Sequence, residues 1–197
     1  MNSLCVYCGA SIGASPVYAD GARLLAKAMV EANIALVYGG GNVGLMGVIA
    51  DEVMRLGGQA TGVIPRALMD KEVGHHGLTQ LHIVKDMHER KALMAELSDG
   101  FIAMPGGIGT LEELFEVFTW SQLGLHDKPI GLLNVNGYYD RLIGFLEHVV
   151  AERFLRQEQA SLLIHDASAC ALVERLRTYV PQRHEKVLDA ATAKKIV

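Results

Sequence analysis

The sequence is poor in the features that mark several large classes of protein. Its 197 residues include only 3 cysteines, too few for a disulfide framework in a chain of this length. It has no apolar run of about 18 residues, the length that spans a membrane. Its first residues lack the basic segment and cleavage site of a secretory signal. We therefore expect a cytoplasmic protein that does not cross a membrane.

Positive charge is not in excess either. The formal net charge is -4, so the basic surface typical of nucleic-acid-binding proteins is not expected, although a local basic pocket remains compatible with it. Half of the residues are hydrophobic, which is enough to form the core of one domain. We predict a nucleotide-binding catalytic domain over residues 1–181 and a polar C-terminal tail over residues 182–197.

Short apolar runs alternate along the chain with segments of helical periodicity. This alternation predicts an α/β fold of Rossmann-like type, a parallel sheet with helices on both faces. The stretch Arg66–Val84 gives few clear signals and is expected to be irregular. The predicted strands cover Ser3–Cys8, Ile34–Tyr38, Gln59–Ile64, Gly100–Met104, Pro129–Asn134 and a short Leu162–Ile164. The predicted helices cover Pro16–Asn33, Leu45–Leu56, Asp86–Leu97, Gly109–Gly124, Tyr138–Phe154 and Ala167–Tyr179.

Glycine, by contrast, is frequent, with 21 residues. The segment Gly39–Gly44 matches G-x-G-x-x-G between a predicted strand and a helix, where glycines such as Gly40 and Gly41 let the backbone approach a phosphate. An NAD-dependent oxidoreductase would need an acid at the end of the next strand. That strand ends in Val63–Arg66 without one, so this alternative is disfavoured. Glycines that serve only a tight turn remain a second interpretation.

A second glycine loop, Pro105–Thr110, also lies between a strand and a helix. Its backbone and the Thr110 hydroxyl can form an anion-binding nest, or Thr110 can simply be the N-cap of its helix. Ser11, in the loop after the first strand, can donate to a ligand or cap a turn. Loops at the carboxyl ends of parallel strands share one edge of the sheet, and together they favour a nucleotide phosphate.

Acidic residues follow this second loop. Glu112, Glu113 and Glu116 stand near the helix start, where carboxylates also favour the helix dipole. Helical geometry places Glu113 with Val117 and Trp120, which indicates partial desolvation. A carboxylate would repel a phosphate, so Glu113 is expected to face a ribose or an attacking water.

Arg90 lies in an apolar helical stripe with Met87, Met94 and Leu97. An arginine there needs an anionic partner, either an acid of the protein or a ligand phosphate. Lys91 adds a second cation, or is a solvated surface lysine.

The C-x-x-C of Cys5 and Cys8 lies in a predicted strand, where positions three apart face opposite sides. Both are expected to be core residues and not a redox pair or zinc ligands. His75 and His76 lack the spacing of a metal site, and no metal or cofactor is predicted.

The chain resembles the LOG (Lonely Guy) family of cytokinin riboside 5'-monophosphate phosphoribohydrolases over about residues 4–181. The resemblance rests on two spaced motifs with collinear flanking segments. These are Tyr38–Gly41 with Gly44–Gly47, Met87–Lys91, Pro105–Glu113 (the family's PGGxGTxxE), Thr119-Trp120, Asp127–Pro129 and Gly137–Tyr139.

The resemblance implies hydrolysis of the N-glycosidic bond of a purine nucleoside 5'-monophosphate, with Arg90 and Glu113 as the catalytic pair. It also implies a homodimer or larger homo-oligomer. Glu72 is implied to contact substrate, with a weaker local match, and Ile108 stands where plant members often have tyrosine. The other residues implied to bind the nucleotide are Lys91, Gly106, Gly107, Ile108, Gly109, Thr110, Leu111, Glu112 and Thr119.

Two functional alternatives follow from the residues. The protein is either an enzyme or a non-catalytic purine-nucleotide-binding module, which would use the same loops. If it is an enzyme, its substrate is either AMP or an N6-prenylated AMP. The label "lysine decarboxylase", often attached to this family, has no support, since no Schiff-base lysine with a pyridoxal site is recognisable.

Overall fold

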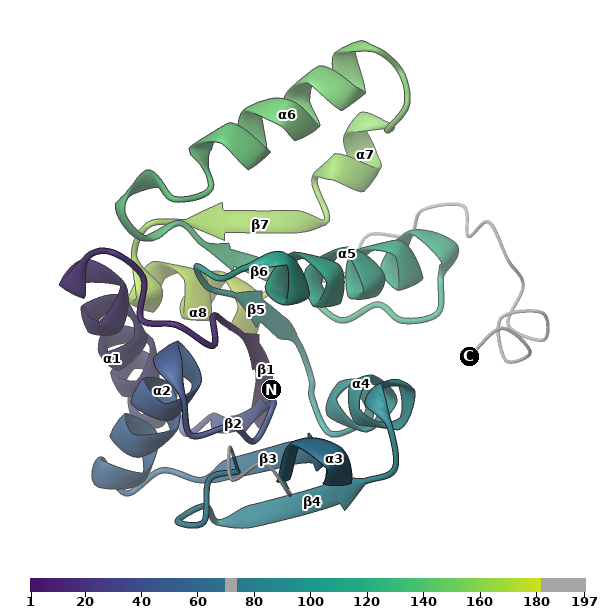
Figure 1. Cartoon of the computed structure of the whole chain (residues 1–197). Helices are drawn as coiled ribbons and strands as arrows, with labels where there is room; N and C mark the ends of the chain where they lie inside the picture. Colours follow the sequence, from purple (N-terminus) through teal and green to yellow (C-terminus); the bar gives the residue numbers. More distant parts are fainter. Residues whose placement is uncertain (70–73, 182–197) are drawn as a thin grey trace.

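The computed structural model describes residues 1–69 and 74–181, and shows a seven-stranded, fully parallel sheet (Figure 1). Glu72 and the 182–197 tail lie outside the described residues. The strand order is β4-β3-β2-β1-β5-β6-β7, and it confirms the predicted α/β class. The strands are β1 (Ser3–Tyr7), β2 (Ala35–Tyr38), β3 (Ala60–Pro65), β4 (Gln80–Val84), β5 (Phe101–Ala103), β6 (Ile130–Leu133) and β7 (Leu163–Asp166).

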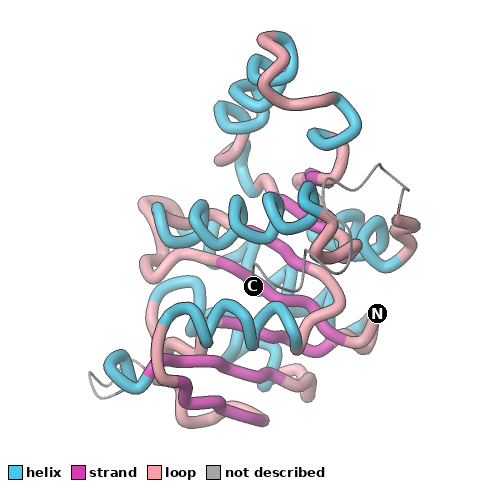
Figure 2. The backbone as a smooth tube through the Cα atoms, turned by 90° about the vertical axis from the view of Figure 1, so that its right-hand side faces the viewer, coloured by secondary structure: helices cyan, strands magenta, loops and turns pink. Residues whose placement is uncertain are grey.

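Helices cover both faces of this sheet (Figure 2). One buried cluster joins β1 and β2 to α1, α2 and α8, and a second joins β1, β5 and β6 to α4 and α5. The alternating side chains of β1 divide between the two, so that Cys5 and Cys8 are free, buried and in different clusters, as predicted. The helices are α1 (Pro16–Glu31), α2 (Gly44–Arg55), α3 (Arg66–Met69), α4 (Met87–Glu96), α5 (Ile108–Leu123), η1 (Val135–Gly137), α6 (Asp140–Ala151), α7 (Gln157–Ala160) and α8 (Ala169–Arg177).

Local signals set the helix boundaries. Ser15 is the N-cap of α1 and accepts from the Val17 amide, with Pro16 in the first turn. Asp86 caps α4 through the His88 and Glu89 amides. Gly124, with φ of 80°, ends α5 in the left-handed conformation that glycine adopts without strain.

The prediction that Arg66–Val84 is irregular is wrong, because this stretch contains α3 and the strand β4. The strand lies at the edge of the sheet and pairs only with β3 among the described strands. Its side chains are mostly exposed or half-buried, so it lacks the continuous apolar run that marks a central parallel strand. The strand β7, at the other edge, extends two residues beyond the predicted Leu162–Ile164 into His165 and Asp166.

The sheet reverses its order between β1 and β5. The strands run 4-3-2-1 to one side of this point and 5-6-7 to the other. In open α/β sheets, the crevice beyond the carboxyl ends of the strands at such a point is the usual ligand site.

Candidate active site

A pocket of about 230 Å³ lies at this reversal point. Residues at the end of β1 form its floor, and its sides come from α4, the first glycine loop and the start of α5. A pocket at this place and with this mixed lining is the expected location of a small-molecule site. The lining residues are Val6, Tyr7, Cys8, Ala10, Gly39, Met46, Arg90, Met94, Gly107, Gly109, Thr110 and Glu113.

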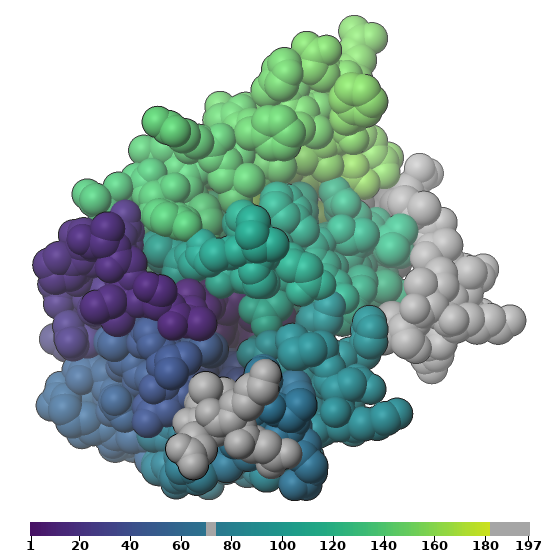
Figure 3. Space-filling view, viewed as in Figure 1, coloured from purple at the N-terminus to yellow at the C-terminus, as the bar shows by residue number. Residues whose placement is uncertain are grey.

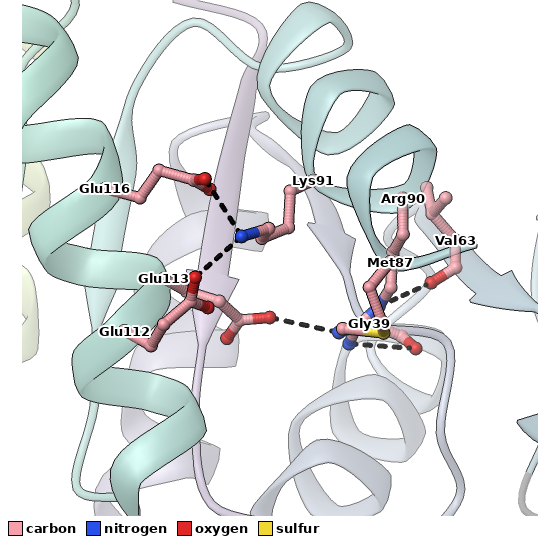
Figure 4. Close-up of polar contacts among 8 residues, drawn as sticks. All are labelled: Gly39, Val63, Met87, Arg90, Lys91, Glu112, Glu113 and Glu116. Carbon is pink, nitrogen blue, oxygen red and sulfur yellow. Dashed lines mark hydrogen bonds and ion pairs between the residues drawn. The ribbon is translucent and has the colours of Figure 1, made fainter.

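Arg90 and Glu113 meet across this pocket. The Arg90 Nη1 lies 3.1 Å from the Glu113 Oε1, and both side chains are only 11% exposed. Figure 4 shows Arg90 extending from α4 toward Glu113 on α5. Among the residues that the structure describes, no other Arg, Lys, Asp or Glu is buried. The partner that the sequence requires for Arg90 is therefore an acid of the protein itself, placed at the pocket wall.

Two backbone carbonyls complete the binding of the arginine. Its Nε donates to the Val63 oxygen at 3.1 Å, and its Nη2 donates to the Gly39 oxygen at 3.4 Å. A Cβ at Gly39 would lie 1.9 Å from the Arg90 Nη2. The first glycine of the G-x-G-x-x-G segment therefore leaves room for the guanidinium.

Burial dominates the electrostatics of Glu113. Desolvation raises the pKa of its carboxyl above the ordinary glutamate value, and the neighbouring Arg90 charge opposes this shift. Glu112 and Glu116 raise the pKa further by repulsion, while Lys91 lowers it. A carboxylate with a raised pKa inside a pocket is suited to handle a proton or to stabilise a developing positive charge.

Lys91 is held by two of these carboxylates. Its Nζ lies 2.6 Å from the Glu112 Oε1 and 2.9 Å from the Glu116 Oε1, as Figure 4 shows. Burial works against its charge, but the hydrogen bonds to Glu112 and Glu116 outweigh this and raise its pKa. The solvated-surface interpretation is wrong, because the Lys91 side chain is only 12% exposed.

The second glycine loop presents the uncapped start of α5 to the pocket. Gly107 is the N-cap and makes no side-chain capping bond, so of the two interpretations of Thr110 the one that makes it the N-cap is wrong. The first amides of a helix lack intrahelical partners and attract anions. A Cβ at Gly107 or Gly109 would meet nothing within 4 Å, and neither has a positive φ. Packing within the described chain therefore does not require these glycines, whereas a ligand lying against the loop would.

The first glycine loop has a structural role. Gly40 has φ of 71°, and its oxygen accepts from the His75 amide. Gly41 pairs with Gly74 in an antiparallel bridge. Gly44 has φ of 57°, and a Cβ there would lie 2.3 Å from the Ala10 carbonyl carbon. Gly40, Gly41 and Gly44 do not line the pocket, so of this segment only Gly39 reaches it.

The remaining predicted residues lie around the pocket or away from it. The Ser11 hydroxyl accepts from the Gly13 amide, which matches the turn-capping alternative. Thr119 is exposed, and Leu111 is half-buried. Ile108 is 82% exposed beside the pocket. Gly106 is part of the second glycine loop but does not line the pocket, and a Cβ there would come within 2.1 Å of the Thr110 Oγ1.

Sequence reasoning missed several lining residues, namely Ala10, Met46 and Met94, because apolar and small side chains give no chemical signal. It also missed the His75–Asp51 pair, with Nε2 and Oδ1 3.0 Å apart, which links His75 to α2. Among the described residues, no group of three or more His, Cys, Asp or Glu is arranged to hold a metal. None of the described helices is long and apolar enough to span a membrane.

Comparison with known proteins identifies the family of the chain. A family model described as "Possible lysine decarboxylase" matches residues 46–176, which include Arg90, Glu113 and the second glycine loop. The chain is 50% identical over 184 residues to cytokinin riboside 5'-monophosphate phosphoribohydrolase LOG1 of Arabidopsis thaliana, covering 93% of this chain and 86% of that protein. The chain belongs to the LOG family.

Other LOG relatives and solved structures extend the comparison. A probable phosphoribohydrolase of rice, LOGL2, is 49% identical and covers 94% of this chain and 76% of its own length. The molybdenum cofactor binding protein of Rippkaea orientalis has a TM-score of 0.68 at 19% identity, covering 89% and 95% of the two chains. The Moco carrier protein of Chlamydomonas reinhardtii has a TM-score of 0.66 at 20% identity, covering 90% and 98%. At such identities these structures show the shared fold alone.

Proposed function

We propose that this LOG-family hydrolase cleaves the N-glycosidic bond of a purine nucleoside 5'-monophosphate, releasing free base and ribose 5-phosphate. The observation that carries the proposal is the buried Arg90–Glu113 pair beside the uncapped start of α5, in one pocket. About 50% identity to curated phosphoribohydrolases supports the same reaction.

The proposed chemistry assigns each group one task. Breaking the bond between ribose C1' and the base passes through an oxocarbenium-like state, as glycoside cleavage does. The Glu113 carboxylate stabilises this positive charge and orients the attacking water, whose proton it accepts as the water oxygen bonds to C1'. The electron pair of the broken bond stays on the nitrogen of the departing base, which takes up a proton from solvent. Arg90 fixes the carboxylate through its Oε1, leaving the other oxygen for the reacting groups. The amides at the start of α5 hold the 5'-phosphate.

The surroundings of the pocket support an N6-prenylated AMP as substrate over AMP. Ile12, Met87 and Ile108 are exposed by 58%, 42% and 82%, from the loop after β1, the start of α4 and the start of α5. Exposed apolar side chains on three elements that converge on a polar pocket favour a ligand with an apolar substituent. The relatives are named for cytokinin riboside 5'-monophosphates, which agrees with this choice.

We further propose a homodimer that forms through α6. This helix has no buried residue and projects with α7 from the body of the molecule (Figures 1 and 3). Its Phe145 is 59% exposed, and Ile143 and Leu146 are only partly covered by the second core cluster. An amphipathic helix covered on one side only is typical of an association surface. Sedimentation of wild type and Phe145→Glu tests this, with a monomeric variant expected.

A cytoplasmic location belongs to the same proposal. Cys5, Cys8 and Cys170 are all free thiols, a state that persists in reducing compartments. Fractionation of the producing cells tests the location.

Incubation with AMP and with isopentenyladenosine 5'-monophosphate, followed by chromatography of the free base, tests the activity. We expect faster release from the prenylated substrate, and loss of about 10²- to 10⁴-fold in kcat for Glu113→Gln. Tight nucleotide binding without base release from either substrate would instead identify a nucleotide-binding module. Wild-type turnover by both Glu113→Gln and Arg90→Ala would refute the assigned pair.

A further inference from the structure

Two adjacent tyrosines hold the backbone of the second glycine loop from behind. The Tyr138 hydroxyl donates to the Gly106 oxygen at 2.6 Å, and the Tyr139 hydroxyl donates to the Met104 oxygen. Both tyrosines follow β6 and its turn η1, so they reach the loop from the next strand of the sheet. None of the catalytic steps described above uses either side chain.

The carbonyl groups around these two are also bound. The Pro105 oxygen accepts from the Gly9 amide at 3.1 Å, and the Gly107 oxygen accepts from the Leu111 amide at 3.2 Å. Four successive carbonyls, from residue 104 to residue 107, are therefore occupied by donors of the protein itself. This part of the loop has its acceptors turned to the protein.

Because the peptide group is planar, the direction of each of these carbonyls also sets the direction of the N–H that follows it. In a trans peptide the C=O and the following N–H point in nearly opposite directions, and the described chain has no cis peptide. Because Tyr138 holds the Gly106 carbonyl on the side of β6, the N–H of Gly107 faces the other way. Gly107 lines the pocket, so this is the side where a ligand oxygen would lie.

We propose that Tyr138 and Tyr139 are positioning residues, whose hydroxyls fix the backbone of residues 104–107 so that the amides at the start of α5 receive the substrate's 5'-phosphate. The inference rests on the proposed placement of the phosphate at this loop. It gives a role to the Gly137-Tyr138-Tyr139 segment, which takes no part in the chemistry proposed for Arg90 and Glu113.

The tyrosines are themselves fixed by their surroundings. The rings of Tyr138 and Tyr139 meet edge to face at 4.9 Å between centroids, and Tyr18 from α1 meets Tyr138 in the same way at 5.7 Å. The Asn134 Oδ1 accepts from the Tyr139 amide at 2.7 Å. Each hydroxyl therefore points at its carbonyl from a ring held on several sides, as a positioning group requires.

The test removes one hydroxyl and keeps the ring. Tyr138 is 43% exposed, so Tyr138→Phe is expected to fold with unchanged stability of the core. We expect KM for the nucleotide and the inhibition constant of inorganic phosphate to rise together by about 3- to 10-fold, the value of one net hydrogen bond, with a smaller change in kcat. Tyr18→Phe, which removes a hydroxyl from the same ring cluster, is the matched control and leaves both constants unchanged. Tyr139→Phe is expected to act in the same direction, with unfolding measured beside it because its hydroxyl bond is buried.

Gly109→Ala separates this inference from the placement of the phosphate. Its methyl group has room in the free protein and would intrude on the ligand. Weaker phosphate inhibition in both Gly109→Ala and Tyr138→Phe supports the inference. Weaker inhibition in Gly109→Ala alone overturns the role of the tyrosines and leaves the phosphate at the loop. No change in either variant overturns both.

Discussion

A single methyl group at Gly39 should displace Arg90 without changing the chemistry of either side chain of the proposed catalytic pair. A Cβ at this position would lie 1.9 Å from the Arg90 Nη2 and 3.0 Å from its Cζ. The φ of Gly39 is not positive, so alanine adopts the same backbone without strain. The substitution therefore acts through the guanidinium, which must leave its place between Gly39, Val63 and Glu113.

The expected loss follows from the contacts that are displaced. The guanidinium would lose some or all of its bonds to the Gly39 and Val63 oxygens and to Glu113. One hydrogen bond to a charged group contributes about 1.5–3 kcal/mol. If that energy is realised in the transition state, kcat/KM falls about 10- to 150-fold for each such bond. The folded protein should also lose stability, because the displaced guanidinium would leave the Glu113 carboxylate buried without its partner.

The initial rate of base release, followed at a series of nucleotide concentrations, measures the loss in kcat/KM. Denaturant unfolding of the same variant measures the loss in stability. Gly144→Ala is a matched control, because a Cβ there meets nothing within 4 Å. It lies within α6, where alanine favours the helix over glycine by about 1 kcal/mol, and it should keep full activity. If Gly39→Ala kept the wild-type kcat/KM, the position of the Arg90 guanidinium beside Gly39 would not be needed for activity.

Three further predictions follow from the titrating groups. Because burial raises the pKa of Glu113, kcat/KM should fall on acidification with an apparent pKa above the ordinary glutamate range. Lys91→Met should move this acidic limb of the pH profile to still higher pH, whereas a substitution at the exposed Lys85, Lys85→Met, should leave it unchanged. An acidic limb at the ordinary glutamate pKa would refute the burial argument. Since the folded pKa lies above the unfolded one, unfolding free energy should decrease as pH rises from the unfolded to the folded pKa, a dependence that Glu113→Gln should remove. Burial raises the pKa of Cys5 to about 12 and also raises the pKa of Cys8, so alkylation of the native protein at pH 8 should label Cys170 alone. Rapid labelling of a second thiol would contradict the burial of Cys5 and Cys8.

The central part of the fold was predictable because its signals are local. Continuous apolar strands and capped helices specify β1, β2 and α4 without reference to the rest of the chain. The edge strand β4 was not predictable, because most of its side chains are exposed or half-buried and its extended conformation depends on pairing with β3. Secondary structure at an edge depends on a neighbour that the local sequence does not contain.

For the site, helical geometry predicted partial desolvation of Glu113 and the need of Arg90 for an anionic partner, either an acid of the protein or a ligand phosphate. It did not give their contact, because 23 residues separate them in the sequence and the contact depends on how α4 and α5 pack. The role of Gly39 was also hidden, since a glycine that leaves room for a distant side chain resembles a glycine in a tight turn. The two glycine loops look alike in sequence but differ in task. One leaves room for the Arg90 guanidinium of the protein itself, and the other leaves the amides at the start of α5 for the phosphate of the proposed substrate.

The connection that leaves the edge strand explains why Arg90 and Glu113 can meet. The chain leaves β4, at one edge of the sheet, and must return to β5, which lies beside β1 on the far side of the reversal point. The helix α4 makes this crossing, and the helix α5 starts at the end of β5 (Figure 1). Arg90 therefore reaches the pocket from the β3 side, where Val63 accepts its Nε, while Glu113 reaches it from the β5 side. The crossing connection therefore carries the cation, and the next helix, α5, carries the carboxylate and has its start facing the pocket, while β4 supports the strand β3 to which Arg90 binds. Substitutions that weaken the pairing of β4 with β3 should consequently lower activity before they lower global stability.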